Sequence, residues 1–472
     1  MNCGGASDRS ETLLLFLYIG NTILRKAGGP KLKHTFLGGI HPLHREHEGK
    51  TATSGAPIRP FVASRVVIPV GMHIGAPSAP TVKKGDHVAV GQMIAEPVGG
   101  LGLPVHASIS GTVTEVEMKQ QLRAGREICI TIEADGNDEW VELKPVGGVE
   151  DTAPADIIAA MKNAGISGMG GASFPAHVKL SIPEGKYADI VILNGAECEP
   201  YLTCDHRLML EESERIVKGA RLLMRAAKVE RCVIAIEDNK PDAIAAMTKA
   251  AAEYPGIEVY TMVTKYPQGA EKQLIRSVTG REVPRGKLPL DAHALVFNVG
   301  TAAATYDAVV LGKPVVERVT TITGSVKNPS NLRMRIGTIF ADAIREAGGI
   351  TAEGDIKLFS GGPMCGIAAP NLDVSMVKST NGIITFAGPD AKIVEESPCI
   401  RCGKCVDGCA MGLMPYAIRN DLDRHDFEAA KAKGIMDCVL CGACSYSCPA
   451  NRFLTSAFKS AKEEITARAR RK

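Results

Sequence analysis

Eight of the chain's fourteen cysteines lie within fifty residues and form two groups with the same spacing. The groups are Cys399-x2-Cys402-x2-Cys405-x3-Cys409 and Cys438-x2-Cys441-x2-Cys444-x3-Cys448-Pro449. In bacterial ferredoxins with this spacing, three close thiolates bind one cluster and the fourth cysteine ligates the other cluster. The spacing therefore predicts two [4Fe–4S] clusters. The expected ligands are Cys399, Cys402, Cys405 and Cys448 for one cluster, and Cys438, Cys441, Cys444 and Cys409 for the other.

Zinc and disulfide bonds are the alternatives for such cysteines. Structural zinc usually takes two close pairs of ligands, which would leave a third close cysteine unused in each group. A disulfide scaffold is typical of much shorter secreted chains, because 472 residues can bury a core without covalent links. Gly403 and Gly442 follow the second cysteine of each group, so the backbone can wrap closely and direct its amides at sulfur. Cys365 lies outside the pattern, and eight ligands already satisfy two clusters.

A glycine-rich stretch, "GISGMGGASFP" at residues 165–175, could approach a phosphate closely. It is not a dinucleotide fingerprint, because no strand precedes it and Ser173 stands where the last glycine should be. Its four glycines can still present backbone N–H groups to an anion. An ordinary flexible loop is the alternative for this stretch taken alone. The glycines are Gly165, Gly168, Gly170 and Gly171.

From about residue 187 the chain alternates apolar, strand-like runs with helical segments. Strands are expected at "ADIVILNG", "RCVIAIED", "IEVYTMVTK" and "ALVFNVG", and helices at 154–163, 208–228, 241–253, from about 269 and from about 301. This alternation predicts a parallel sheet with helices on its faces, which binds ligands at the carboxyl ends of its strands. Polar residues follow all four strands: Asn194, Glu197 and Glu199; Glu237, Asp238, Asn239 and Lys240; Tyr266, Gln268 and Glu271; Asn298 and Thr301. With the glycine loop, they predict a cofactor cleft.

Four motifs together point to a family. They are "GMGGASFP", "LNGAECEPYLTCDHRL", "YPQGAEKQLI" and "NVGTAAA". The chain resembles the NADH- and flavin-binding 51-kDa-type subunits of respiratory complex I, and more closely the RnfC-type subunits of the Rnf electron-transport complex, over roughly residues 34–455. Complex I proteins have further acidic residues where this chain has Ala196 and Ala270, so not all flavin contacts carry over.

The resemblance implies an FMN site and an NADH site. FMN would be held by Gly168, Gly170, Gly171, Lys179, Asn194, Asn298 and Thr301, with Glu197 and Glu271 near the nicotinamide or ribose of NADH. The implied domains are a barrel-sandwich hybrid at 34–145, the FMN/NADH-binding α/β domain at 146–314, a β-grasp (SLBB) domain at 315–370 and a two-cluster ferredoxin-type domain at 371–458. They are flanked by an N-terminal extension at 1–33 and a basic tail at 459–472.

The flanking segments suggest no further chemistry. The hairpin "PVGGLGLP" of the barrel sandwich has no lysine for a swinging arm, so this domain is expected to be structural or a docking surface. The basic tail is either a solvated helix end or a site that docks onto anionic lipid or an acidic partner. Four histidines have the irregular spacing of loop residues rather than of metal ligands: His41, His44, His47 and His73.

Composition excludes some classes of function. The chain is 45% hydrophobic and 23% charged with a formal charge of +3, which is typical of a folded protein and argues against nucleic-acid binding. The apolar run Leu13–Ile19 has seven residues, against the roughly 20 needed to span a bilayer. Acidic residues precede the run, so a signal peptide is also a poor interpretation.

We therefore predict a multidomain α/β electron-input subunit that takes hydride from NADH onto FMN and passes single electrons through two [4Fe–4S] clusters, with no catalytic triad. By the resemblance, it binds the membrane-embedded and peripheral subunits of an Rnf complex on the cytoplasmic side of the bacterial inner membrane. That complex couples NADH and ferredoxin to ion movement. Two alternatives remain: a soluble flavin and iron–sulfur reductase, such as a microcompartment cobalamin reductase, and a non-enzymatic electron relay.

Overall fold

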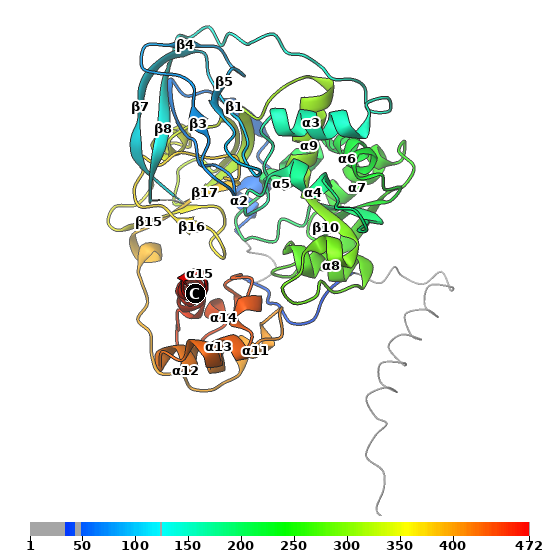
Figure 1. Ribbon diagram of the computed structural model, residues 1–472. Helices are drawn as coiled ribbons and strands as arrows, with labels where there is room; N and C mark the ends of the chain where they lie inside the picture. Colours follow the sequence, from blue (N-terminus) through cyan, green and yellow to red (C-terminus); the bar gives the residue numbers. More distant parts are fainter. Residues whose placement is uncertain (1–33, 43–48, 123–124, 472) are drawn as a thin grey trace, which may run out of the picture. The chain divides into compact units, whose positions relative to one another are not determined.

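The computed structural model describes residues 34–42, 49–122 and 125–471. Within it, Thr35–Lys472 forms one compact unit, which contains four sheets and a helical segment (Figure 1). The expected N-terminal extension at 1–33, and with it His44 and His47, lies outside the described residues.

Two small antiparallel sheets form the barrel sandwich. The first has the strand order β2-β8-β7-β4 and the second β3-β5-β6. Their strands are β2 (Arg65–Pro69), β3 (Ala79–Pro80), β4 (His87–Val88), β5 (Met93–Glu96), β6 (Val105–His106), β7 (Gly111–Gln121) and β8 (Gly125–Ala134). The chain requires glycine where β7 begins, since a Cβ at Gly111 would lie 1.9 Å from the carbonyl oxygen of Glu133.

The predicted parallel sheet is confirmed, with the order β11-β10-β9-β12. Its strands are β9 (Ile190–Asn194), β10 (Cys232–Glu237), β11 (Ile257–Met262) and β12 (Ala294–Asn298). The helices are α3 (Pro154–Asn163), α4 (Ala176–Leu180), α5 (Cys204–Glu211), α6 (Ser213–Ala227), α7 (Pro241–Ala251), α8 (Glu271–Thr279) and α9 (Val299–Val310), with a 3-10 turn at η1 (Pro289–Ala292).

Helices cover both faces of this sheet because successive strand residues point to opposite sides. Val191 and Leu193 of β9 pack in a core with α3, α6, α7 and α9, whereas Ile190 and Ile192 pack with α8. The expected single helix at 208–228 is instead two helices, α5 and α6. Glu212 separates them with a non-helical backbone (φ −134°, ψ 34°).

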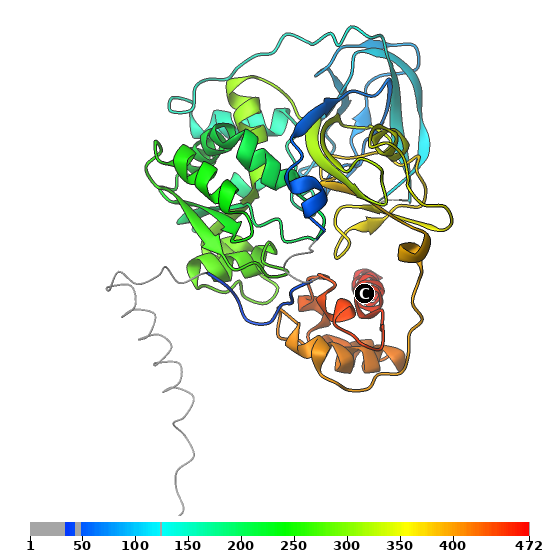
Figure 2. The same ribbon diagram turned by 180° about the vertical axis from the view of Figure 1, so that it is seen from behind.

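The β-grasp sheet has the order β1-β14-β13-β17-β15-β16. Its elements are β1 (Ile58–Phe61), β13 (Glu317–Gly324), β14 (Ser330–Arg335), α10 (Phe340–Glu346), β15 (Ile356–Ser360), β16 (Ile367–Ala368) and β17 (Gly382–Ala387), with α2 (Thr51–Ser54) before β1 and η2 (Gly388–Ala391) after β17. This sheet includes strands from outside the expected domain at 315–370: β1 comes before that range in the sequence and β17 comes after it. β17 pairs in parallel with β13, and β1, the dark blue strand of Figure 2, pairs in parallel with β14.

The segment that carries the cysteine groups is helical. It contains α11 (Lys404–Asp407), α12 (Pro415–Asp423), α13 (Phe427–Ala432), the 3-10 turn η3 (Ile435–Asp437), α14 (Ala443–Tyr446) and α15 (Leu454–Arg471). The predicted basic tail is the second part of α15, which buries Phe458, Ala461 and Ile465 against the rest of the segment. Among the described residues, no helix combines the length and the apolar character that a bilayer span requires.

Candidate functional site

The glycine loop is a hairpin whose tip is exposed. The amide of Gly168 donates to the carbonyl oxygen of Phe174 at 2.8 Å, and Ser167 bridges to Pro175. The tip, residues 170–172, is exposed to solvent, and a Cβ at Gly171 would meet no atom within 4 Å. The loop can therefore receive a ligand at its tip rather than along its paired stem.

Contacts with α9 place this tip at the carboxyl edge of the parallel sheet. Thr301 Oγ1 accepts a hydrogen bond from the amide of Met169 at 3.1 Å. Gly170 lies against Asn298, since a Cβ at Gly170 would come within 3.0 Å of the Asn298 Cβ. Asn298 ends β12 and caps α9 by accepting a 2.8 Å hydrogen bond from Gly300 N. The structure thus brings three of the predicted FMN residues together: Gly170, Asn298 and Thr301.

Two further predicted residues, Lys179 and Glu271, form an ion pair at the same edge. Lys179 Nζ lies 2.8 Å from Glu271 Oε1 and donates to the carbonyl oxygen of Val296 at 2.9 Å. Asn194 joins the end of β9 to the loop before α8, because its Nδ2 donates to Gly269 O at 2.7 Å. Asn194 ends β9, Glu271 begins α8 and Lys179 lies on α4, so three separate elements bring polar side chains to this edge.

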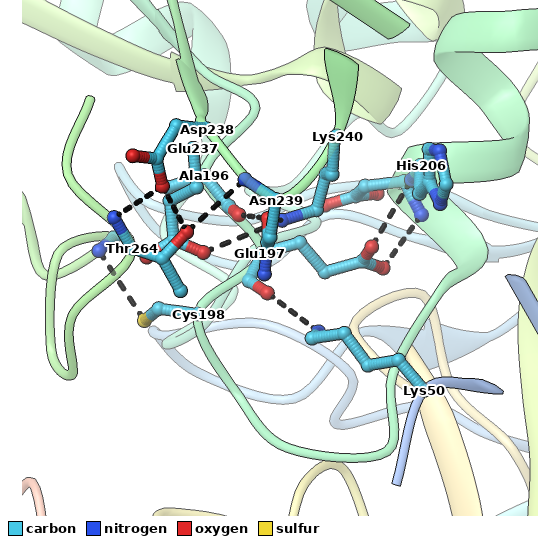
Figure 3. A network of polar contacts seen from close by, with 12 residues as sticks. Lys50, Ala196, Glu197, Cys198, His206, Glu237, Asp238, Asn239, Lys240 and Thr264 are labelled. Atoms are coloured by element: carbon cyan, nitrogen blue, oxygen red, sulfur yellow. Dashed lines mark hydrogen bonds and ion pairs between the residues drawn. The ribbon is translucent and has the colours of Figure 1, made fainter. Parts of the chain in front are cut away.

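Glu197 has a different environment from the one that the resemblance implied. Its carboxylate accepts hydrogen bonds from the amides of Asp205 and His206, at 2.8 and 3.1 Å, in the first turn of α5. Figure 3 shows this carboxylate directed at His206. A carboxylate satisfied at a helix N-terminus is stabilised there by the helix dipole. The structure therefore gives Glu197 a partner in the protein itself, and a contact with NADH remains a prediction.

Asp205 links this helix cap to the predicted FMN site. Its Oδ2 accepts a 2.6 Å hydrogen bond from Asn298 Nδ2. Burial, followed by the charge of Glu197, raises the pKa of Asp205 to about 7. Glu197, Cys204 and Asp205 place possible metal ligands within 4.8 Å of one another, but the hydrogen bonds from α5 and Asn298 already account for both carboxylates. Asp205 orients Asn298, and the sequence pattern contained no signal for this role.

Two lysines hold the backbone of residues 196–202 after β9 (Figure 3). Lys240, which is 1% exposed, donates from Nζ to Ala196 O at 2.7 Å and lies 3.3 Å from Glu237 Oε2. Lys50 donates to the carbonyl oxygens of Glu197, Glu199 and Leu202 at 2.8, 2.8 and 2.6 Å. Lys240 follows a strand, as a cleft residue should, whereas Lys50 precedes the sheet by well over 100 residues and no local pattern could reveal its role.

The structure brings each expected set of four cysteines together. We call Cys399, Cys402, Cys405 and Cys448 the cluster-1 site, and Cys409, Cys438, Cys441 and Cys444 the cluster-2 site. The four cysteines of the cluster-1 site line one pocket. In the cluster-2 site, burial raises the pKa values of Cys441 and Cys444 to about 11 and about 12, and nearby Cys438 and Cys409 add to both shifts. None of the described cysteines forms a disulfide bond, so these thiols can bind iron.

The two sites share one backbone design. Gly403 and Gly442 are left-handed, with φ of 80° and 82°, and so are Arg401 and Leu440. The amides of Arg401 and Leu440 lie 3.4 Å from the sulfur atoms of Cys399 and Cys438. Amides aimed at sulfur stabilise a thiolate-ligated cluster, so the residues fit the predicted groups.

The cluster-2 site lies directly against the nucleotide domain. Tyr266, which is 1% exposed, follows β11, and its hydroxyl donates to the carbonyl oxygen of Cys441 at 2.6 Å. Gln273 of α8 donates to Ala410 O at 3.2 Å. Lys462 of α15 donates to Cys438 O at 2.6 Å, which gives this residue of the predicted tail a place beside the cluster.

Cys365 belongs to this contact and not to a cluster. Its sulfur lies 2.7 Å from Glu199 Oε1 and 2.9 Å from the Tyr266 hydroxyl. Burial raises the pKa of Glu199, and the donors from Cys365, Met364 and Tyr266 partly offset that shift. The β-grasp domain therefore reaches the same point at which the nucleotide domain meets the cluster-2 site.

A nucleotide-type α/β domain and two ferredoxin-type cluster sites in one chain define an electron-transfer flavoprotein. Family models support this class: residues 161–307 match the Nuo51 FMN-binding domain, 34–137 the RnfC barrel sandwich hybrid domain, 319–368 the SLBB domain and 398–452 the 4Fe-4S dicluster domain. The predicted fold class and cofactor types are thereby confirmed.

Three curated proteins are similar over most of their length. The C subunit of the Na+-translocating ferredoxin:NAD+ oxidoreductase complex of Acetobacterium woodii is 46% identical over 443 residues, which cover 93% of this chain and 99% of that protein. The C subunit of the proton-translocating complex of Clostridium ljungdahlii is 47% identical over 384 residues, 81% of this chain and 83% of the relative. The C subunit of the ion-translocating oxidoreductase complex of Rhodobacter capsulatus is 41% identical over 449 residues, which cover 94% of this chain and 85% of that protein.

The chain belongs to this RnfC family, the C subunits of ion-translocating ferredoxin:NAD+ oxidoreductase complexes. These relatives confirm the family that the four motifs indicated. As a subunit of such a complex, the chain has other subunits as partners.

Proposed function

We propose that this chain exchanges electrons between NADH and the rest of an Rnf-type complex. The exposed glycine tip with Gly168, Gly170 and Gly171 would hold FMN together with Asn194, Asn298, Thr301 and Lys179, and Glu271 and Glu197 would lie near NADH. Bound FMN would supply the conversion between the two-electron hydride of NADH and the single electrons that a cluster carries. The protein would orient the two rings and keep water away from them.

One observation carries the proposal that these electrons enter the clusters of the same chain. The Tyr266 hydroxyl, which follows a strand of the nucleotide domain, donates to the carbonyl oxygen of the cluster ligand Cys441. This contact favours the cluster-2 site as the first acceptor. Cys399 and Cys402 of the cluster-1 site are exposed, which favours that site as the outlet to a partner. We propose that all eight cysteines ligate the two [4Fe–4S] clusters.

The proposed partners are the membrane-embedded and peripheral subunits of the complex, with ferredoxin reached through them and no nucleic acid involved. The named relatives couple ferredoxin and NAD+ to movement of Na+ or protons. We propose the same coupling here, from a peripheral position on the cytoplasmic side of the bacterial inner membrane. The barrel sandwich matches the RnfC model, which favours a subunit of a membrane-bound complex over a soluble reductase that acts alone.

Reconstitution of the full chain tests the proposal. With iron, sulfide and FMN, we expect about eight irons per chain and NADH-dependent reduction of ferricyanide. Cys441→Ser should block reduction of the remaining cluster by NADH, whereas Cys402→Ser should leave the cluster-2 site reducible, as followed by electron paramagnetic resonance. Cys129→Ser, in buried β8, is the control. Failure of the protein to bind FMN would refute the enzyme, and equal effects of the two ligand variants would refute the order.

A further inference from the structure

Two buried cations of the β-grasp domain hold both ends of residues 165–169, the entry to the glycine loop. Lys378, in the turn before β17, donates from Nζ to Gly165 O at 2.7 Å and to Pro104 O at 3.2 Å. Arg318 of β13 donates from Nη1 to Met169 O at 3.1 Å and to the carbonyl oxygen of Lys378 at 2.7 Å. The loop that would hold FMN thus takes its position from another domain.

Among the described residues, Lys378 has no acidic partner, whereas the charge of Arg318 acts on the buried carboxyl group of Asp205 and partly offsets the rise that burial causes in its pKa. Lys378 is 2% exposed and Arg318 is 6% exposed. Across the described ranges of the chain, no carboxylate oxygen lies within 4.0 Å of either side-chain nitrogen. A buried charge without a counter-ion is strongly disfavoured, so it persists in a fold only if something else favours it. An anion that binds at the loop would provide that stabilisation.

Lys378 packs closely against the start of the loop. A Cβ at Gly165 would lie 2.6 Å from Lys378 Nζ and 3.6 Å from the His106 ring. His106 and His73 of the barrel sandwich are the ionisable groups that sense the charge of the ammonium. Arg318 of the β-grasp sheet donates to the backbone carbonyl oxygen of Lys378. None of these groups can neutralise the ammonium, because all are neutral or positive.

The titration of these groups singles out Lys378. Burial lowers the pKa of Lys378 to about 7. Burial, with the charge of Lys378, lowers the pKa values of His106 to about 3 and of His73 to about 4, so both rings stay neutral near pH 7. Arginine remains charged throughout this range. Among these four groups, Lys378 is therefore the one that can gain or lose a proton near neutrality. Asp205, which is bonded to Asn298 beside the loop, also has a pKa of about 7.

We propose that Lys378 is a positioning residue for the phosphate group of the flavin, and that phosphate binding at the glycine loop is coupled to uptake of one proton by Lys378. This inference rests on the proposed function, since the phosphate is that of FMN. The charged ammonium holds the Gly165 carbonyl and adds positive potential at the base of the loop, whereas the neutral amine does so more weakly. The bound dianion in turn favours the charged form of the lysine.

Flavin binding to the full chain, stripped of flavin, tests the coupling. FMN affinity should fall by roughly tenfold per pH unit between pH 7.5 and 9, where its phosphate is already a dianion. Calorimetry in two buffers of different ionisation enthalpy should show uptake of about one proton per FMN at pH 8. Riboflavin, which lacks the phosphate, should bind without proton uptake.

Variants of Lys378 distinguish an effect of its charge on FMN binding from an effect of the substitution on folding. Lys378→Met should bind FMN more weakly at pH 7 and lose the pH slope, and Lys378→Arg should lose the slope while it keeps tight binding at pH 9. Lys162→Met, which removes an exposed lysine of α3 near the loop, should behave like the wild type. If Lys378→Met does not fold, Lys378→Arg decides, because it removes the titrating lysine and keeps Asp205, whose pKa is also about 7. A wild-type affinity independent of pH, without proton uptake, would overturn the inference and leave the proposed function intact. Absence of FMN binding at every pH would refute both.

Discussion

The hydroxyl group of Tyr266 lies 2.6 Å from the carbonyl oxygen of Cys441 and donates a hydrogen bond to it. This bond joins the loop after β11 to a cysteine of the cluster-2 site across 175 positions of the sequence. Because Tyr266 is 1% exposed, water cannot replace the partner that either group would lose. The contact therefore stabilises the packing of the nucleotide domain against the cluster domain, together with the bond from Gln273 to Ala410.

Tyr266→Phe should keep the ring and remove the bond. We expect normal FMN and iron content, a loss of about 0.5–1.5 kcal/mol in stability, and electron transfer from flavin to cluster that is several-fold slower in stopped-flow experiments. Tyr260→Phe, on β11, removes a hydroxyl that accepts a hydrogen bond from Arg231 and is the matched control. An unchanged transfer rate in Tyr266→Phe would show that the bond does not support the electron path.

Gly442→Ala and Gly403→Ala form a second matched pair. Both glycines have φ near 80°, so alanine should cost about 1–2 kcal/mol at either position. Only at Gly442 would the new Cβ also collide with a neighbour, the Met364 carbonyl oxygen at 2.6 Å. We therefore expect Gly442→Ala to lose more iron per chain and to have a lower thermal midpoint than Gly403→Ala. Equal losses would contradict the close packing of the cluster-2 loop against the β-grasp domain.

Asp205→Asn should change how stability depends on pH. The pKa of Asp205 is raised to about 7 in the fold, above its usual value of 3.8, so the native state binds the proton more tightly than the unfolded state. The wild type should therefore lose up to roughly 1.4 kcal/mol per pH unit as the pH rises from 4 to 7, relative to the variant. Thermal midpoints of the two proteins at pH 5 and pH 8 measure the difference. Parallel profiles would contradict the burial of an ionisable carboxyl group beside Asn298.

In flavin-free protein, Lys378→Met should change the pH dependence of stability in the direction opposite to Asp205→Asn. The pKa of Lys378 is lowered to about 7 from 10.5, so the unfolded chain binds the proton more tightly between these values. The destabilisation by the buried charge is complete below pH 7 and is relieved as the pH rises, by roughly 1.4 kcal/mol per unit. The wild type should thus gain thermal stability relative to Lys378→Met between pH 7 and 9. Midpoints that stay a constant distance apart would show that the lysine does not titrate there.

The local parts of the site could be predicted from the sequence because their chemistry depends on spacing. Eight cysteines at ferredoxin spacing predict the cluster ligands, since three closely spaced sulfur atoms bind one cluster. Polar residues after four apolar runs identify the sheet edge, because parallel strands end together. Gly403 and Gly442 likewise have left-handed backbones at the positions where the pattern required close approach.

Contacts between distant segments could not be predicted in this way. β1 and β17 join the β-grasp sheet from outside the expected range, and strand pairing over such separations has no local signal. The Glu197 carboxylate binds the N-terminus of α5, because two amides of the first helical turn have no partner within the helix. This contact depends on the position of α5 in the fold, which a local pattern does not give.

The sequence alone determined the class of this protein and its cofactor types, and it predicts the ligands of its clusters, because each depends on residues a few positions apart. Only the tertiary structure decided which cluster site faces the nucleotide domain and that Lys50 and Lys378 hold the cleft and its loop. Those roles arise from burial and hydrogen bonding between domains, where removal from water makes each charge and each carbonyl group depend on a partner far away in the chain.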